Sequence, residues 1–412
     1  MSAATPDLAS LIHDWNAPGG TPWLPGRHVE LDDETLRDGL QNPSVTDPSL
    51  EDKRRILHLQ DRLGIDSSDI GLPGAGPKAY EHVKALCEEI RDSRLDIAAN
   101  CAGRTMIQDA EPMVRITNET GVPIEACLFI GSSPIRQFVE EWTVDDILRR
   151  STEAIAYATK EGLPVMYVTE DTTRADPETL RRLYTAAVEA GAKRVCVSDT
   201  VGHATPEGAH AVVKFVREVV DATGEKIKVD WHGHRDRGLG VANCLAAIHA
   251  GADRVHGCAV GIGERAGNAE IELILVNLLL LGWSDRDLTA LPEYCETVAR
   301  AVGTSIPKNL PIVGSDAFET ATGVHAAAVI KAYQKGADWL ADRIYSSVPA
   351  SAVGRRQQIK VGAMSGKSNV SWWLKEHGHE VNDEVVQRIL AFAKQSARNL
   401  EDAELERLVA GK

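Results

Sequence analysis

Hydrophobic and polar residues alternate along most of this chain in a pattern of short strands, each followed by a longer helical segment. Amphipathic stretches of helical period cover, for example, residues 50–63, 78–92, 145–161 and 177–190. Apolar, strand-like runs precede and separate such stretches, and eight of them begin near Val29, Ile65, Leu95, Pro123, Val165, Arg194, Ile227 and Arg254. A helical crossover makes neighbouring strands parallel, and eight such units close into a barrel. The pattern therefore predicts an α/β fold, a (β/α)8 TIM barrel over residues 28–295.

The alternation ends near residue 295, and the remaining chain has a helical pattern with Gly and Pro breaks. Helices are expected over residues 323–335 and 383–410, with Trp372 and Trp373 packing them together. We therefore expect a linker and mainly helical C-terminal subdomains at residues 296–412. Residues 1–27 precede the first strand as an N-terminal extension.

Composition narrows the class of protein. The 412 residues carry a net charge of −15, which argues against nucleic acid or an anionic membrane as partner and favours small molecules. No apolar run is long enough to span a bilayer, and the first thirty residues lack the pattern of a secretory signal, so we expect a cytoplasmic protein. The seven cysteines never form C-x-x-C, which predicts reduced thiols and no structural zinc.

Polar residues follow several of the expected strands at the point where each strand ends. They are Asp33 to Gly39, Glu170-Asp171, Ser198 to Thr200, and His232-Gly233-His234. Each group alone reads equally well as loop residues or helix caps. In a barrel, however, the carboxyl ends of the strands share one mouth, where catalytic groups of such folds gather. We therefore expect these side chains to converge on one site.

The two histidines of His232-Gly233-His234 point the same way if the segment is extended. Paired imidazoles suit divalent cations such as zinc, manganese or cobalt, although an isolated pair is more often polar surface. The glycine-rich run Gly261 to Asn268 is not followed by the Lys-Ser/Thr of a nucleotide loop. We interpret it as a tight loop close to a ligand, with Asn268 offering an oxygen to a metal or its water.

These motifs together resemble a known family. The patterns D-x-T-L-R-D-G-x-Q, H-x-H-N-D-x-G-x-A-x-A-N and G-x-G-E-R-A-G-N stand here as Asp33 to Gln41, His232 to Asn243, and Gly261 to Asn268. They are similar to those of the Claisen-condensing enzymes 2-isopropylmalate synthase, homocitrate synthase and citramalate synthase, with 3-hydroxy-3-methylglutaryl-CoA lyase as a more distant relative. The resemblance runs from about residue 28 to 370.

The resemblance implies an acyltransferase that joins acetyl-CoA to a 2-oxo acid at a divalent metal: magnesium, manganese, zinc or cobalt. The family pattern places the metal on Asp38, His232, His234 and Asn268. Arg37 would stabilise charge on the substrate oxygens, Glu170 would assist proton transfer, and Thr200 would bind the carboxylate of the oxo acid. His325 and Tyr345, which from spacing alone are equally plausible as core or surface residues, would reach the site from the partner subunit of a homodimer.

Departures from the family pattern concern the substrate. Asp69 stands in place of a glutamate on the second strand, Arg235 in place of an asparagine, and Arg104 keeps an arginine on the third strand. With Arg37 and Thr200, these three are the expected substrate-binding residues. Arg235 would pair with a carboxylate of either substrate or protein. Isopropylmalate synthesis is the leading expectation, with homocitrate or citramalate synthesis as alternatives.

Cys258 leaves a further alternative open, a lyase running the reverse cleavage, because the lyases carry a cysteine after the eighth strand. A small buried cysteine is the plainer interpretation. The sequence ends at Lys412, so we expect no C-terminal regulatory domain of the leucine-sensing kind.

Overall fold

The computed structural model describes residues 11–17 and 22–411, so the expected N-terminal extension lies partly outside the described residues. The chain divides into two compact units. One holds residues 23–286 and 293–305; the other holds residues 287–292, those from 306 onward, and the chain before Trp23.

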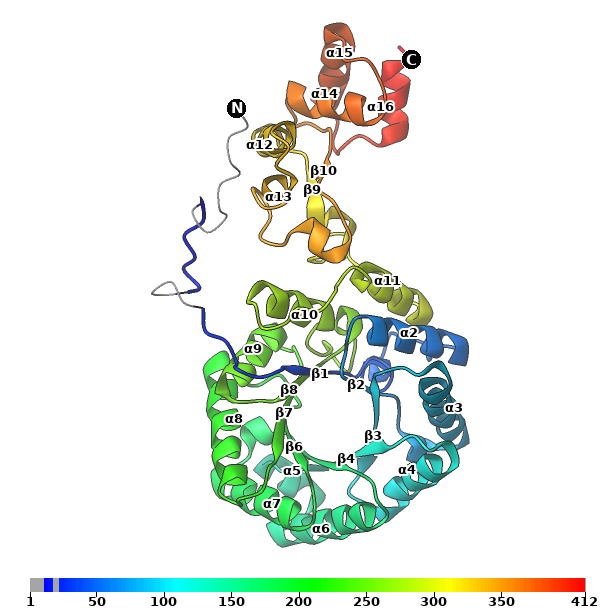
Figure 1. The fold of residues 1–412 in the computed structure, drawn as a ribbon, viewed down its shortest axis with the longest axis vertical. Coiled ribbons are helices and arrows are strands. Elements are labelled where there is room, and N and C mark those ends of the chain that lie inside the picture. The colour runs from blue at the N-terminus through cyan, green and yellow to red at the C-terminus, as the bar shows by residue number, and fades with distance from the viewer. Residues whose placement is uncertain (1–10, 18–21, 412) are drawn as a thin grey trace. The chain divides into compact units, whose positions relative to one another are not determined.

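The larger unit is the predicted barrel. Eight parallel strands pair in chain order, and the last closes onto the first (Figure 1). Every strand begins within three residues of its predicted position. The strands are β1 (Glu30–Asp33), β2 (Ser67–Asp69), β3 (Ala98–Arg104), β4 (Ile124–Gly131), β5 (Val165–Glu170), β6 (Arg194–Asp199), β7 (Lys228–Gly233) and β8 (Arg254–Gly257).

Helices surround this ring of strands (Figure 1). Their starts are set by local chemistry: Thr143 forms a capping box with Asp146, and the side chains of Asp176 and Thr205 cap two other helices. The helices are α2 (Leu50–Arg62), α3 (Pro77–Ser93), α4 (Ile107–Thr120), α5 (Pro134–Glu140), α6 (Val144–Lys160), α7 (Pro177–Glu189), α8 (Pro206–Asp221), α9 (Gly240–Ala250), α10 (Ile271–Leu280) and α11 (Leu291–Val302).

Charged residues, as well as apolar ones, are buried among the strands of the barrel. Asp230 on β7 is fully buried and lies 2.6 Å from both Arg194 Nη1 and Arg254 Nε. Burial opposes ionisation, but the two guanidinium groups hold the pKa of Asp230 well below its usual value. Removing one partner of a buried ion pair is strongly destabilising, because it leaves the other charge buried and unpaired. The contacts of Asp230 with Arg194 and Arg254 therefore hold β7 in place between β6 and β8.

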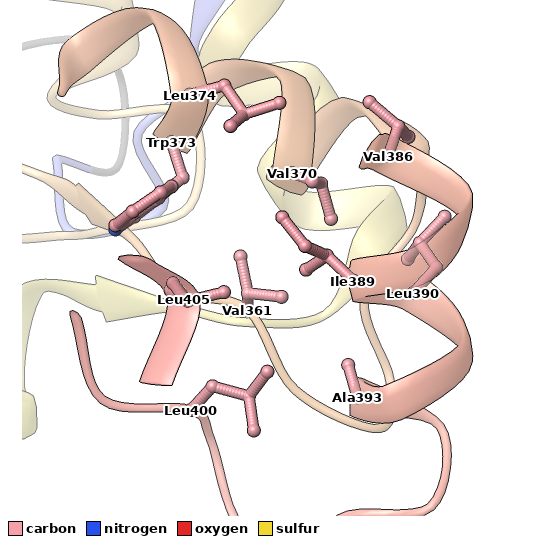
Figure 2. Close-up of a cluster of buried hydrophobic side chains, with 10 residues drawn as sticks. All are labelled: Val361, Val370, Trp373, Leu374, Val386, Ile389, Leu390, Ala393, Leu400 and Leu405. Atoms are coloured by element: carbon pink, nitrogen blue, oxygen red, sulfur yellow. The ribbon is translucent and has the colours of Figure 1, made fainter. Parts of the chain in front are cut away.

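In its described residues from 306 onward, the second unit contains a two-stranded parallel sheet and five α-helices. They are β9 (Glu319–Thr320), β10 (Gln358–Ile359), α12 (Gly323–Gln334), α13 (Asp338–Ala341), α14 (Lys367–Glu376), α15 (Asp383–Ala393) and α16 (Asp402–Val409). Trp373, 3% exposed, lies in the apolar core formed by the last three helices (Figure 2). Trp372 instead stacks on Tyr333, with ring centroids 5.3 Å apart.

The expected helix over residues 383–410 is wrong as one continuous element. It breaks after Ala393 and resumes at Asp402. The physical reason is the core itself: Leu400 and Leu405 are buried in the same cluster as Ile389 (Figure 2), and the backbone N–H of Leu400 donates to Val361 O at 2.8 Å. A straight helix would carry the two leucines away from that cluster.

Among the described residues, no helix combines the length and apolar character needed to cross a bilayer.

Candidate active site

The carboxyl ends of the barrel strands surround a cavity of about 270 Å³. The residues that the strand-end pattern singled out meet there, as expected from the closed barrel. Those that line it are Glu34, Arg37, Asp38, Glu170, Ser198, Thr200, His232 and His234. Their chain positions span about two hundred residues, so only closure of the sheet brings them together.

Asp38, His232 and His234 form a compact group of potential metal ligands. Asp38 Oδ2 lies 3.6 Å from His232 Nε2 and 3.6 Å from His234 Nε2. Asp38 is 3% exposed and His234 is 5% exposed. Asp38 Oδ2 and the nearby Asn268 Oδ1 are buried acceptors with no hydrogen-bond partner, which is costly unless a cation or water satisfies them. One carboxylate, two imidazoles and a free amide oxygen fit a divalent metal.

The two imidazoles are in different electrostatic environments. Burial and the neighbouring His232 lower the pKa of His234 to about 4, so that ring is neutral and has a lone pair to offer at neutral pH. Burial would also lower the pKa of His232, but Glu34, 2.7 Å from its Nδ1, more than offsets this and raises it. That contact leaves Nε2 of His232 facing Asp38.

Arg37 is held in place by three carboxylates. Its Nε donates to Asp69 Oδ2 at 2.6 Å, and its other nitrogens lie 3.3 Å from Glu34 and 3.3 Å from Asp38. Asp69 is 1% exposed and is not among the residues that line the cavity. Burial raises the pKa of Asp69, while Arg37 opposes that rise. Asp69 therefore holds the guanidinium of Arg37 in place from outside the cavity, while Arg37 itself lines the cavity.

Glu170 and Thr200 border the same cavity from β5 and the end of β6. Burial raises the pKa of Glu170, although Arg136 and Arg37 counteract it, and a carboxyl with a raised pKa is better suited to exchange protons near neutral pH. Thr200 Oγ1 accepts from the backbone N–H of Asp171 at 2.8 Å. The hydroxyl proton of Thr200 thus remains available for a ligand.

The structure does not bring Arg104 and Arg235 to this cavity. Arg104 donates through Nε and Nη2 to Asp109, at 2.8 Å in each case, and its side chain is 61% exposed. Arg235 pairs with Glu270 and donates through Nε to Ala266 O at 2.8 Å. Of the two partners expected for Arg235, the geometry shows the protein carboxylate.

The loop after β8 closes one side of the cavity. Arg265, which borders the cavity with Glu264, donates to Asp236 at 2.9 Å and to Thr200 O at 2.7 Å. Gly267 has a φ of +98°, and a Cβ there would lie 1.9 Å from Gly261 O, so only glycine permits this turn. The tight loop close to a ligand, expected from the glycine spacing, agrees with this geometry.

Cys258 is fully buried beneath that loop and is not among the cavity-lining residues. Burial raises the pKa of its thiol well above the usual value, and the side-chain amide of Asn268 lies 3.4 Å from its sulfur. A buried, protonated thiol is a poor nucleophile or acid catalyst. This placement agrees with the interpretation of Cys258 as a small buried residue.

His325 and Tyr345 belong to the other unit, on α12 and after α13. Their rings stack on each other with centroids 4.1 Å apart and planes at 26°. Both side chains are exposed. The two residues are therefore paired as one surface feature, which spacing along the sequence did not predict.

Several cavity residues were missed by the sequence analysis. The apolar ones include Leu72, Phe129 and Met166, which carry no distinguishing signal in the sequence. Glu34 and His256 also line it. Glu34 lay inside a recognised motif without an assigned role, and His256 stands two residues after the buried Arg254, a spacing that places both on one face of β8.

The sequence of this chain is similar to those of known proteins. Residues 28–298 match the family model described as HMGL-like. A protein of Methanopyrus kandleri named "Probable 2-isopropylmalate synthase" is 35% identical over 90% of this chain and 70% of its own length. A homocitrate synthase of the same organism is 32% identical over 93% of this chain and 94% of its own length.

Among solved structures, a 3-hydroxy-3-methylglutaryl-CoA lyase of Bacillus subtilis superposes with a TM-score of 0.57. It is 22% identical, and the match covers 68% of this chain and 95% of the lyase. At that identity the likeness supports the barrel fold and no more.

Proposed function

Because the chain belongs to the HMGL-like family, in the branch of synthases that condense acetyl-CoA, we propose that it joins acetyl-CoA to a 2-oxo acid, with 2-oxoisovalerate preferred. The observation that supports this most is the convergence of Asp38, His232 and His234 with Arg37 in one cavity at the mouth of the barrel. The product would be 2-isopropylmalate, with CoA released.

In this proposal Asp38, His232 and His234 hold a divalent metal, with Asn268 in or near its coordination sphere. A bound divalent cation supplies Lewis-acid polarisation of the ketone of the 2-oxo acid. Arg37 stabilises the negative charge that grows on the ketone oxygen as the new bond forms, because a preorganised cation needs no rearrangement at that moment. The hydroxyl of Thr200 donates to the carboxylate of the oxo acid.

The reaction forms a carbon–carbon bond between the acetyl methyl group and the ketone carbon. The methyl group loses a proton to a base, the ketone oxygen gains one, and water cleaves the thioester to release CoA. His325, together with Tyr345, is the proposed general base that removes the methyl proton. Glu170, which lines the cavity, assists proton transfer. The raised pKa of Glu170 suits that role.

The side chain of the oxo acid would occupy the apolar part of the cavity. Cys127, Met166, Val168 and Cys196 form one apolar cluster of the lining, and Leu72 and Phe129 also line the cavity. The cationic lining residues, Arg37 and Arg265, are paired with carboxylates. A second carboxylate, as in 2-oxoglutarate, would lose its hydration there without gaining a partner. The lining therefore favours a branched aliphatic side chain over an acidic one.

A thiol-release assay tests the substrate directly. Metal-loaded protein with acetyl-CoA is offered pyruvate, 2-oxobutyrate, 2-oxoisovalerate, 2-oxoglutarate and oxaloacetate in turn. We expect kcat/KM to be highest with 2-oxoisovalerate and at least about tenfold lower with pyruvate, because each lost methyl group forfeits burial worth on the order of 1 kcal/mol. Release of CoA with 2-oxoglutarate as the best substrate would contradict the proposed specificity, and no release with any acid would contradict the synthase.

We further propose that His325 and Tyr345 act in the barrel of the partner subunit of a homodimer. Co-expression of two differently tagged inactive variants, His232→Ala and His325→Ala, tests this. A mixed dimer would contain one intact barrel served by one intact His325, so random pairing should restore about a quarter of wild-type activity. If His325 acts within its own chain, every site in the mixed dimer stays defective and no activity returns.

A further inference from the structure

Glu34 connects two buried histidines beneath the candidate metal site. Its Oε2 lies 2.7 Å from His232 Nδ1, and its Oε1 lies 3.0 Å from His256 Nδ1. Glu34 is 4% exposed and His256 is 2% exposed. Oε1 hydrogen-bonds with His256 and accepts from Arg37, whereas Oε2 makes a close ionic contact with His232 and has no hydrogen-bond partner. A buried carboxylate oxygen of this kind depends on the neighbouring imidazole for its stabilisation.

His256 is fixed from its other side as well. Its Nε2 lies 3.0 Å from Asp230 Oδ2, so both ring nitrogens face carboxylate oxygens and both must donate. A ring that donates twice has no lone pair left for a metal. The second cluster of potential ligands in the barrel, Glu34 with His232 and His256, is therefore a support made of a hydrogen bond and a close ionic contact, and not a second metal site.

Asp230, the partner of His256, is itself bound by two arginines. Asp230 is held by Arg194 and Arg254, each at 2.6 Å, in the buried layer between the strands. A continuous series of contacts thus runs from these guanidinium groups through Asp230, His256 and Glu34 to Nδ1 of His232. It connects β8 and the end of β1 with β7.

We propose that Glu34 and His256 are positioning residues that fix the tautomer and ring orientation of His232, so that its Nε2 lone pair is aimed at the metal. A proton held on Nδ1 by a carboxylate leaves the lone pair on Nε2, the nitrogen that faces Asp38. His256 and Arg37 both bind Oε1 of Glu34 and so hold its other oxygen beside His232. The inference rests on the metal part of the proposed function and is independent of which 2-oxo acid is used.

The variant Glu34→Gln tests this role, since it keeps the shape of the side chain but replaces one accepting oxygen with an NH2 group. The full-length protein is stripped with a chelator and titrated with Co2+, which is followed by its visible absorption. We expect the Kd for Co2+ to rise about 10- to 100-fold, the usual effect of losing such a partner, and the absorption spectrum of the bound Co2+ to shift. His256→Gln should move both readouts in the same direction by a smaller factor.

Asp33→Asn provides a matched control at the adjacent residue, the last of β1. Asp33 is also a buried carboxylate, but it accepts from Tyr294 and from the Thr35 backbone and faces neither ligand histidine. This variant should change thermal stability while leaving the Co2+ Kd and spectrum as in the wild type. Equal losses of Co2+ affinity in Asp33→Asn and Glu34→Gln would show a general structural effect and overturn the proposal.

Two further outcomes separate this inference from the synthase proposal. Wild-type affinity and spectrum in Glu34→Gln would overturn the positioning role even if the enzyme condenses acetyl-CoA. Conversely, tight Co2+ binding by the wild type that weakens in Glu34→Gln, without any CoA release, would uphold the positioning role and contradict the proposed synthase.

Discussion

Replacing His232 with alanine is expected to weaken divalent-metal binding and reduce CoA release by about 10³-fold or more. The substitution removes the ligand whose Nε2 lies 3.6 Å from Asp38, and it leaves Glu34 with a buried oxygen facing no imidazole. Loss of metal-based charge stabilisation costs several kcal/mol, and each 1.4 kcal/mol or so is tenfold in rate. Metal content after dialysis and steady-state kinetics with excess metal are the measurements.

His58→Ala is the matched control for that change. His58 lies on α2, pairs with Glu89 and has a side chain 43% exposed, outside the cavity. It should retain wild-type metal content and kinetics. If His232→Ala binds metal as tightly as His58→Ala does, the ligand set proposed here is wrong.

The second large effect is expected at Arg37. A lysine at this position keeps the positive charge but loses the planar fork that meets Asp69, Glu34 and Asp38 together. The remaining ammonium is drawn to one carboxylate and no longer sits where charge develops on the substrate. We expect kcat for Arg37→Lys to fall by about 10²-fold or more, as for loss of one transition-state donor, with a smaller change in KM for acetyl-CoA.

Arg104→Lys makes the same chemical change at an arginine that the cavity does not include. Its guanidinium is engaged with Asp109 at the protein surface. Kinetic constants close to wild type are expected there. An equally large loss of kcat in Arg104→Lys would mean that Arg104 reaches substrate in the working enzyme, as the sequence pattern first predicted.

The sequence predicted the barrel well because its signals are local. Runs of strand residues followed by amphipathic, capped helices repeat eight times, and parallel pairing follows from the crossovers. The same regularity placed Asp38, His232 and His234 at or just after strand ends, and the structure brings the three side chains together. Their role as metal ligands, which the family resemblance implies, stays a prediction. The one helix that the sequence overextended, residues 383–410, failed because its break is set by the position of Leu400 in a distant core.

The sequence did not predict which side chains from different strands and loops contact each other. Nothing local distinguishes Arg37, which faces the cavity, from Arg104, whose charge is satisfied by Asp109 on the next helix. Arg235 had two plausible carboxylate partners, and only the fold brought Glu270 to it. The apolar lining from Phe129 and Met166 likewise depends on which face of each strand turns inward.

The sequence by itself thus determined the barrel, the place of its mouth and the polar side chains gathered there, because strand ends and residue chemistry are properties of short segments. Only the tertiary structure decided which arginines are paired with carboxylates away from the cavity, as Arg104 and Arg235 are, and which one, Arg37, lines it. It also decided that Glu34, His256 and Asp230 stand in series behind His232. Those relations depend on distances between residues as far apart as β1 and β8, which closure of the barrel sets and no local pattern records.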